Sequence, residues 1–139
     1  TGGVDDGDRG TVPYLSPERA RGAGASKAAD VWALGVLMCE LASHRAPFAS
    51  CGSGGTRDKV VLGLLRALRA GTSRADVDGT LGRIPLPRAH AQEGGGGGVT
   101  DGFAALAREC LAVDPAARPH AWTVADRLHQ LCAAAETVP

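Results

Sequence analysis

Hydroxyl, carboxylate and guanidinium side chains gather beside prolines at two places in the chain. One is Gly10-Thr11-Val12-Pro13-Tyr14-Leu15-Ser16-Pro17-Glu18, and the other is Asp114-Pro115-Ala116-Ala117-Arg118-Pro119. A threonine hydroxyl both donates and accepts hydrogen bonds, and the planar fork of a guanidinium suits a carboxylate. Taken singly, however, Thr11 fits a turn residue, and Glu18 and Arg118 fit two unrelated surface charges. The surrounding elements are needed to distinguish these interpretations from a functional role.

Other residue patterns that support chemistry are missing. Cys39, Cys51, Cys110 and Cys132 form no Cys-x-x-Cys pair, and three of them fall within apolar helical patterns. We therefore expect buried thiols in a reducing, intracellular setting rather than a zinc site or disulfides. The run from Gly94 to Gly98 is not a phosphate cradle, because no strand leads into it and no Lys-Ser/Thr closes it.

The element expected to position the motifs is the run from Asp30 to Glu40, the most apolar stretch of the chain. Its apolar residues cover nearly the whole circumference of a helix, and a helix that is apolar all round lies inside a protein. The run is shorter than the ~20 residues of a membrane span. The pattern predicts a buried central helix, although an ordinary core helix of any bundle would look the same.

Three further amphipathic helices are expected after the central one. Their apolar faces are Val61, Leu64, Leu65 and Leu68, then Phe103, Leu106, Ala107, Cys110 and Leu111, then Val124, Leu128, Leu131, Cys132 and Ala135. The expected caps and stops are Thr56, Gly71, Thr100, Asp114-Pro115 and a capping box of Thr123 with Asp126.

Three segments, 1–9, 49–55 and 72–99, are predicted to be flexible, since glycine, proline and small polar residues dominate most of them. The 139 residues predict a single domain with a real core, supported by a hydrophobic content of 44%. Fifteen basic residues balance fifteen acidic ones, and no basic patch or basic amphipathic helix predicts a nucleic-acid or membrane partner. No secretory signal is visible at the start, and the lack of an initiator Met suggests a piece of a longer protein.

The motifs occur in an order that identifies a family resemblance. Gly-Thr-x-x-Tyr-x-Ser-Pro-Glu from Gly10, Asp-x-Trp-x-x-Gly from Asp30, and Asp-Pro-x-x-Arg-Pro from Asp114 follow one another at family-like spacing. The chain resembles the C-terminal part of the large lobe of a eukaryotic-type serine/threonine protein kinase catalytic domain. The resemblance implies a mainly α fold over residues 1–139, from the end of the activation segment to the last helix, with the N-lobe absent. Val12-Pro13 and the stretch 27–35 also resemble the never-in-mitosis-A-related group.

The resemblance assigns roles to the first motif. Thr11 would support the catalytic aspartate, which this chain does not contain, and Gly10, Thr11 and Tyr14 would line the loop that faces the protein substrate. Tyrosine kinases carry a proline-led sequence here, so Gly10-Thr11 implies specificity for serine and threonine.

The other two motifs receive structural roles from the same resemblance. Glu18 and Arg118 would form a buried ion pair that ties the activation segment to the last helices. Asp30, Trp32 and Gly35 would anchor the central helix, with Asp30 bonded to backbone groups of the catalytic loop and Gly35 permitting close packing.

Kinases also need a glycine-rich loop, a strand lysine, a His-Arg-Asp aspartate and a metal-binding Asp-Phe-Gly, and none occurs here. Lys27 and Lys59 are the only lysines, and no predicted strand precedes either. ATP and Mg would be cofactors of the complete kinase, and we expect this chain alone to bind neither of them, nor any other metal. Its expected partners are a protein substrate and the missing N-terminal part of the kinase domain.

The sequence therefore predicts a fragment of a cytoplasmic kinase that transfers phosphate from ATP to protein serine or threonine. In this fragment the substrate-side scaffold is present and catalysis is not. The alternative is a degenerate kinase-like interaction module that works by binding. A third reading is an unrelated helical bundle with chance motif matches.

Overall fold

A computed structural model describes residues 11–81, 83–84 and 99–136, with the side chains of residues 74, 78, 99 and 100 left out. The predictions about Gly10, the segment 1–9 and the glycine run 94–98 lie outside the described residues. In the part described, all regular structure is helical, which confirms the mainly α class. The elements are η2 (Val12–Tyr14), α1 (Pro17–Ala20), α2 (Lys27–Ser43), η3 (Ala49–Cys51), α3 (Gly54–Ala67), α4 (Arg74–Leu81), α5 (Val99–Cys110), η4 (Pro115–Ala117) and α6 (Ala121–Glu136).

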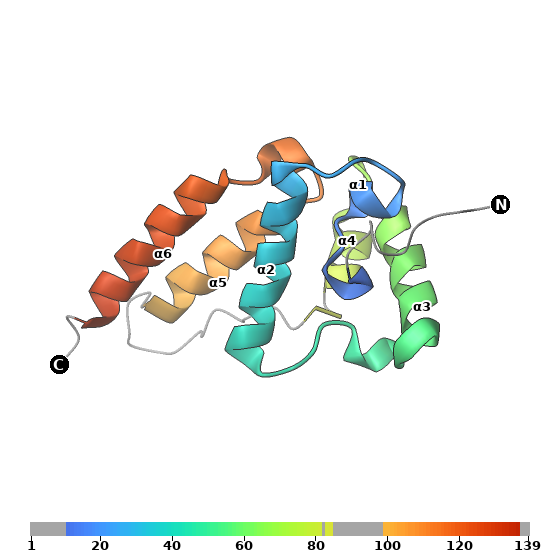
Figure 1. The fold of residues 1–139 in the computed structure, drawn as a ribbon, viewed down its shortest axis with the longest axis horizontal. Helices are drawn as coiled ribbons and strands as arrows, with labels where there is room; N and C mark the ends of the chain where they lie inside the picture. Colours follow the sequence, from blue (N-terminus) through green and yellow to red (C-terminus); the bar gives the residue numbers. More distant parts are fainter. Residues whose placement is uncertain (1–10, 82, 85–98, 137–139) are drawn as a thin grey trace.

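Helix α2 is the centre of the molecule (Figure 1). Ser26 caps its start, since the side-chain oxygen accepts a hydrogen bond from the Ala29 N–H at 3.0 Å. His44 ends it in the left-handed conformation, with φ of 58°, and its N–H donates to the Glu40 carbonyl. The buried residues of α2 are Ala29, Val31, Trp32, Gly35, Val36, Met38 and Cys39.

Two groups of helices pack against α2 from opposite sides (Figure 1). Helices α5 and α6 form an antiparallel pair on one side, and α5 provides the contact with α2. On the other side, α3 packs against α1, η2 and η3. The contact with α5 is close because Gly35 has no side chain. A Cβ at that position would lie 2.7 Å from the Cβ of Cys110, closer than real atoms approach.

Two of the three segments predicted to be flexible, 49–55 and 72–99, contain helical structure in the residues described. Within 49–55, η3 occupies Ala49–Cys51 and α3 already begins at Gly54, two residues before the predicted cap Thr56. Within 72–99, α4 occupies Arg74–Leu81. The Ser73 side chain accepts from the Asp76 N–H at 3.2 Å and donates to the Asp76 carboxylate at 2.9 Å, which satisfies the start of α4.

Helix ends also differ from the prediction by a few residues. Helix α3 stops at Ala67 because Leu68 turns into an extended conformation, and Gly71, the predicted stop, follows with φ of 93°. Helix α5 begins at Val99, one residue before the predicted cap Thr100, and ends at Cys110, before Asp114-Pro115. Helix α6 begins at Ala121, ahead of Thr123.

The cysteines are all free, but they are not all buried. Cys39 and Cys110 are buried, Cys51 is half-buried, and Cys132 is exposed, contrary to the expectation for Cys132. The reason is that α6 packs chiefly on α5, so only a narrow stripe of α6 is covered. Among the described helices, none has the length and apolarity that crossing a membrane requires.

Candidate functional site

The segment from Thr11 to Glu18 is held in place by its own turns. The Tyr14 and Leu15 N–H groups donate to the carbonyls of Thr11 and Val12, both at 3.0 Å, and this forms η2. Ser16 is buried, and its side-chain oxygen accepts from the Arg19 N–H, which starts α1. Thr11 itself is exposed, and its hydroxyl caps nothing in η2. The backbone of Thr11 is therefore fixed while its side chain faces outward.

Tyr14 is attached to the central helix. Its hydroxyl donates a hydrogen bond to the Glu40 carboxylate, 26 positions away. This bond, together with burial, raises the pKa of Tyr14, so the phenol stays protonated and keeps donating. Tyr14 was assigned to the substrate-facing loop, and the structure adds that it is held against α2. Glu40 was missed as a site residue, because in the sequence it marks only the end of an apolar run.

Arg118 forms the most extensive polar contact of the molecule's interior. Its two terminal nitrogens donate to the two carboxylate oxygens of Glu18 at 2.7 and 2.8 Å, a bidentate pair across 100 positions. Further donations reach the carbonyls of Ala112 at 2.8 Å, Ala28 at 3.0 Å and Val113 at 3.4 Å. We call this set the Arg118 clasp. It ties α1 to the start of α2 and to the chain that leaves α5.

The surroundings of the Arg118 clasp favour the charged form of both partners. The Arg118 side chain is 0% exposed and that of Glu18 is 14% exposed. Burial works against the Glu18 carboxylate, but its hydrogen bonds, chiefly those from Arg118, outweigh burial and lower its pKa. The guanidinium carbon of Arg118 also lies 5.2 Å from the centre of the Trp32 ring, within the range of a cation–π contact. The three carbonyls carry no side-chain signature, so the sequence could not reveal them.

The predicted anchor residues of α2 divide between the interior and the surface. Trp32 is fully buried, and its indole N–H has no hydrogen-bond partner in the described residues. Gly35 allows the close approach of Cys110. Asp30 lies in the first turn of α2 and is exposed, with no side-chain partner among the described residues. Its assigned role toward a catalytic loop stays a prediction.

One face of α2 is not covered in the described part of the chain. Asp30, Leu34, Leu37 and Leu41 follow one another at helical spacing, and Leu37 is 42% and Leu41 63% exposed. We call these four residues the open face. Within the described part of the chain, the open face therefore exposes two large aliphatic side chains, Leu37 and Leu41.

Both lysines of the chain lie on helices. Lys27 is the first residue of α2 and Lys59 lies within α3, so neither follows a strand. No group of three or more His, Cys, Asp or Glu side chains in this part of the chain could hold a metal ion.

A comparison with protein families identifies the family to which the chain belongs. The family model of the protein kinase domain matches residues 6–130. The chain belongs to the protein kinase domain family. The Arg118 clasp and the Tyr14–Glu40 contact are thus features of a kinase domain, in the helical part of it.

Curated relatives agree with this family. The chain is 40% identical over 76 residues, 55% of its length, to mitogen-activated protein kinase kinase 5 of Leishmania mexicana, covering 13% of that protein. It is 30% identical over 113 residues, 81% of its length, to the mitogen-activated protein kinase kinase MKK2 of Pyricularia oryzae, covering 19% of it. It is also 54% identical over 39 residues, 28% of its length, to the serine/threonine-protein kinase PrkC of Bacillus subtilis, covering 6% of it. The chain thus spans less than a fifth of each of these relatives.

No solved structure matches the chain significantly. The never-in-mitosis-A-related group stays a prediction.

Proposed function

We propose that the chain is the substrate-side scaffold of a serine/threonine protein kinase, which transfers phosphate from Mg-ATP to serine or threonine of a cytoplasmic protein substrate. The observation that carries this proposal is the Arg118 clasp. It fixes the segment that leads from Thr11 to Glu18 on a frame of α1, α2 and α5. A loop that presents a protein substrate to a reacting phosphate needs such a fixed base, since small misplacements lower the rate.

Specificity for serine and threonine is supported by two findings. The first is the Gly10-Thr11 pair, where the resemblance implies serine/threonine kinases. The second is the name of PrkC, a serine/threonine-protein kinase. Thr11 is exposed on a fixed backbone, the placement needed for a hydroxyl that positions a catalytic aspartate.

The groups that bind ATP and Mg would come from the missing N-terminal part of the kinase domain. The open face of α2 supports this, because the catalytic loop and the preceding helix of a complete kinase domain would cover it, and Asp30 would then gain backbone partners. The same open face also favours the second candidate, a degenerate module that docks on another protein. An in-frame His-Arg-Asp and Asp-Phe-Gly just upstream in the gene would support the enzyme, and a true start codon at the boundary before Thr1 would support the module.

The function is tested in the complete kinase domain with radiolabelled ATP and a peptide library that contains serine, threonine and tyrosine acceptors. We expect label on serine and threonine. Thr11→Ala should lower kcat while leaving the melting temperature within about 2 °C, since the side chain is exposed. Thr11→Ser keeps the hydroxyl and serves as the matched control. Label on tyrosine alone, or wild-type turnover in Thr11→Ala, would contradict the assignment.

A further inference from the structure

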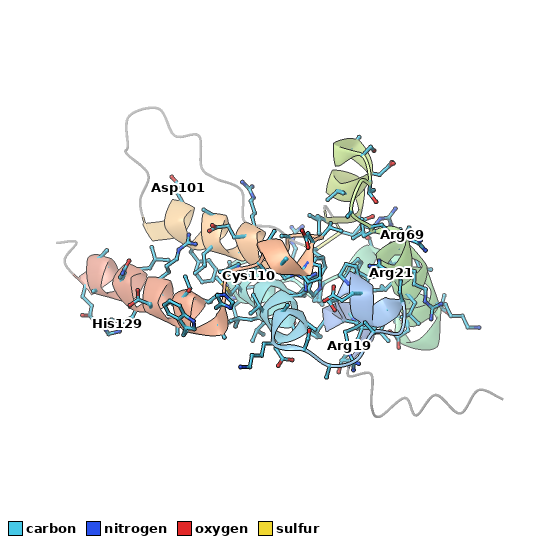
Figure 2. All side chains as sticks on the ribbon, turned by 90° about the horizontal axis from the view of Figure 1, so that it is seen from above. Arg19, Arg21, Arg69, Asp101, Cys110 and His129 are labelled. Carbon is cyan, nitrogen blue, oxygen red and sulfur yellow. The ribbon has the colours of Figure 1, made fainter. Side chains whose placement is uncertain are left out.

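Four arginines line one cavity at the end of the molecule where α1 meets α3. The cavity has a volume of about 530 Å³ and is lined by Arg19, Ala20, Arg21, Gly22, Arg66 and Arg69. Figure 2 labels three of these arginines beside α1 and α3. We call this cavity the arginine pocket. Its volume falls within the range of about 300–1,000 Å³ that is usual for ligand sites.

Three of the guanidinium groups are held in the pocket wall by the backbone. Arg66 donates through Nε to the Ala20 carbonyl at 2.8 Å, and Arg21 donates to the Leu68 carbonyl. These two bonds run in opposite directions between α1 and α3. Arg19 donates to the Ala23 carbonyl at 2.9 Å. Each bond uses one of the five N–H donors of a guanidinium, so Arg21 and Arg66 are positioned without being used up.

A simpler role for such arginines is to neutralise the carbonyls at helix ends. Arg21 and Arg66 do contact carbonyls at the ends of α3 and α1, but Arg69 does not. The backbone of Arg69 is fixed by Thr72, whose hydroxyl accepts from the Arg69 N–H at 2.9 Å, while its side chain makes no hydrogen bond in the described residues. Helix-end neutralisation therefore leaves the fourth cation unexplained.

No carboxylate of the described residues lines the arginine pocket, and none of Arg21, Arg66 and Arg69 forms an ion pair there. Glu18, the acidic residue next to Arg19 in sequence, is taken up by Arg118. Like charges that converge on one cavity repel each other, and a bound anion relieves this repulsion.

We propose that the arginine pocket binds the phosphate group of a phosphorylated protein segment. Guanidinium forks match phosphate oxygens through paired hydrogen bonds, and a phosphorylated side chain carries close to two negative charges. A protein segment is the occupant because the pocket is wider than a phosphate ion and because α3, which supplies Arg66, packs against η2 of the substrate-side segment. This inference rests on the proposed function, and it adds a substrate class: proteins that already carry a phosphate away from the acceptor residue.

The test is a binding measurement by fluorescence anisotropy with the complete kinase domain and no ATP. The probes are a labelled peptide with one phosphoserine among neutral residues, the same peptide without phosphate, and inorganic phosphate as a competitor. We expect the phosphopeptide to bind at least about tenfold more tightly than the unphosphorylated peptide. Inorganic phosphate should compete only at much higher concentration than the phosphopeptide.

The variants separate the arginine pocket from general positive charge. Arg69→Gln should weaken phosphopeptide binding about five- to tenfold. Arg69→Lys should keep only part of the wild-type affinity, because lysine keeps the charge but lacks the forked donors of the guanidinium. Arg69 is preferred over Arg21, whose loss would also remove a bond to Leu68. Arg45→Gln, an exposed arginine outside the pocket, is the matched control and should bind like wild type.

Equal binding of the two peptides, or equal loss in Arg69→Gln and Arg45→Gln, would overturn the proposal. Competition by inorganic phosphate as strong as that by the phosphopeptide would also overturn it, since the site would then take a free anion. Phosphate transfer to an unphosphorylated peptide, measured in parallel, reports on the proposed function separately. Phosphopeptide binding without phosphate transfer would support the arginine pocket and contradict the proposed kinase function. Phosphate transfer without phosphopeptide binding would support the kinase function and contradict the arginine pocket.

Discussion

Breaking the Arg118 clasp from either side should destabilise the kinase domain strongly. Glu18→Ala would leave a guanidinium with 0% exposure without its carboxylate. Arg118→Ala would leave the Glu18 carboxylate unpaired, and would also strip a donor from each of three carbonyls and the cation from the Trp32 ring. Removing one partner of a buried ion pair costs about 3–5 kcal/mol. We expect both variants in this range, with Arg118→Ala the worse.

The coupling between the two residues can be worked from the two bonds that join them. Both are short, at 2.7 and 2.8 Å, and both are charge-assisted. One such bond contributes about 1.5–3 kcal/mol, so a coupling energy of at least about 1.5 kcal/mol is expected in a double-mutant cycle. Arg118→Lys keeps the charge but cannot make the bidentate contact, and it should lose part of this energy.

The assay is urea unfolding of the complete kinase domain, followed by tryptophan fluorescence, to which buried Trp32 contributes. The matched control is the ion pair between Arg127 and Glu109, whose side chains are 34% and 51% exposed. Exposed pairs contribute about 0.2–1 kcal/mol, so this second cycle should show little coupling. A coupling below about 0.5 kcal/mol between Glu18 and Arg118 would refute the reasoning, because residues in direct contact do not behave additively.

Four further outcomes follow from individual contacts. The stability that Glu18 contributes should be fully present above its unfolded-state pKa and be lost as the pH falls through the lowered folded-state pKa. A pH series of urea midpoints should show this loss of stability in wild type and not in Glu18→Gln. Gly35→Ala should lower the free energy of unfolding by about 1–3 kcal/mol because its Cβ would meet Cys110. The control Gly63→Ala, whose Cβ would have nothing within 4 Å, should be neutral or stabilising. Equal free energies of unfolding for the two variants would contradict the close contact. Iodoacetamide at pH 8 should label exposed Cys132 first, because burial raises the pKa of Cys39 to about 12 and that of Cys110 to about 11. If mass spectrometry found Cys39 labelled first, the burial of Cys39 would be contradicted. In the 139-residue chain, the double variant Leu37→Gln and Leu41→Gln should reduce both the binding of a hydrophobic dye and light scattering. The control Val60→Gln on α3, a residue with 42% exposure, should change both signals less. Unchanged dye binding in the double variant would show that the dye does not bind at the open face.

Motif order was the most informative part of the sequence. Residues 100 positions apart, such as Glu18 and Arg118, cannot be paired from local pattern, and only the family resemblance predicted their contact. The apolar run from Asp30 predicted the central helix, and the structure adds that Ser26 starts it, earlier than the apolar residues do. A cap is a local signal, but serine is common in loops, so it is noticed only once the helix is known.

The remaining misses have physical causes. Helix α4 has a mixed surface, with Gly79 within eight residues, so the pattern did not distinguish it from a loop. Cys132 fell within an apolar helical pattern, but whether a face is covered depends on the number of neighbouring helices, which periodicity does not report. Glu40 and the carbonyl partners of Arg118 became visible only when tertiary structure brought them to Tyr14 and to the guanidinium.

The Arg118 clasp also has a consequence for the order in which the domain assembles. Helix α2 and the hairpin of α5 and α6 join residues that are near in sequence, whereas the contact between Glu18 and Arg118 closes a loop of 100 positions. Closing a long loop costs entropy that is recovered only when the contact forms, so we expect this contact to form after the main folding barrier. Variants of the clasp would then fold at nearly the normal rate and unfold faster. The clasp would set the lifetime of the folded kinase domain rather than the speed at which it forms.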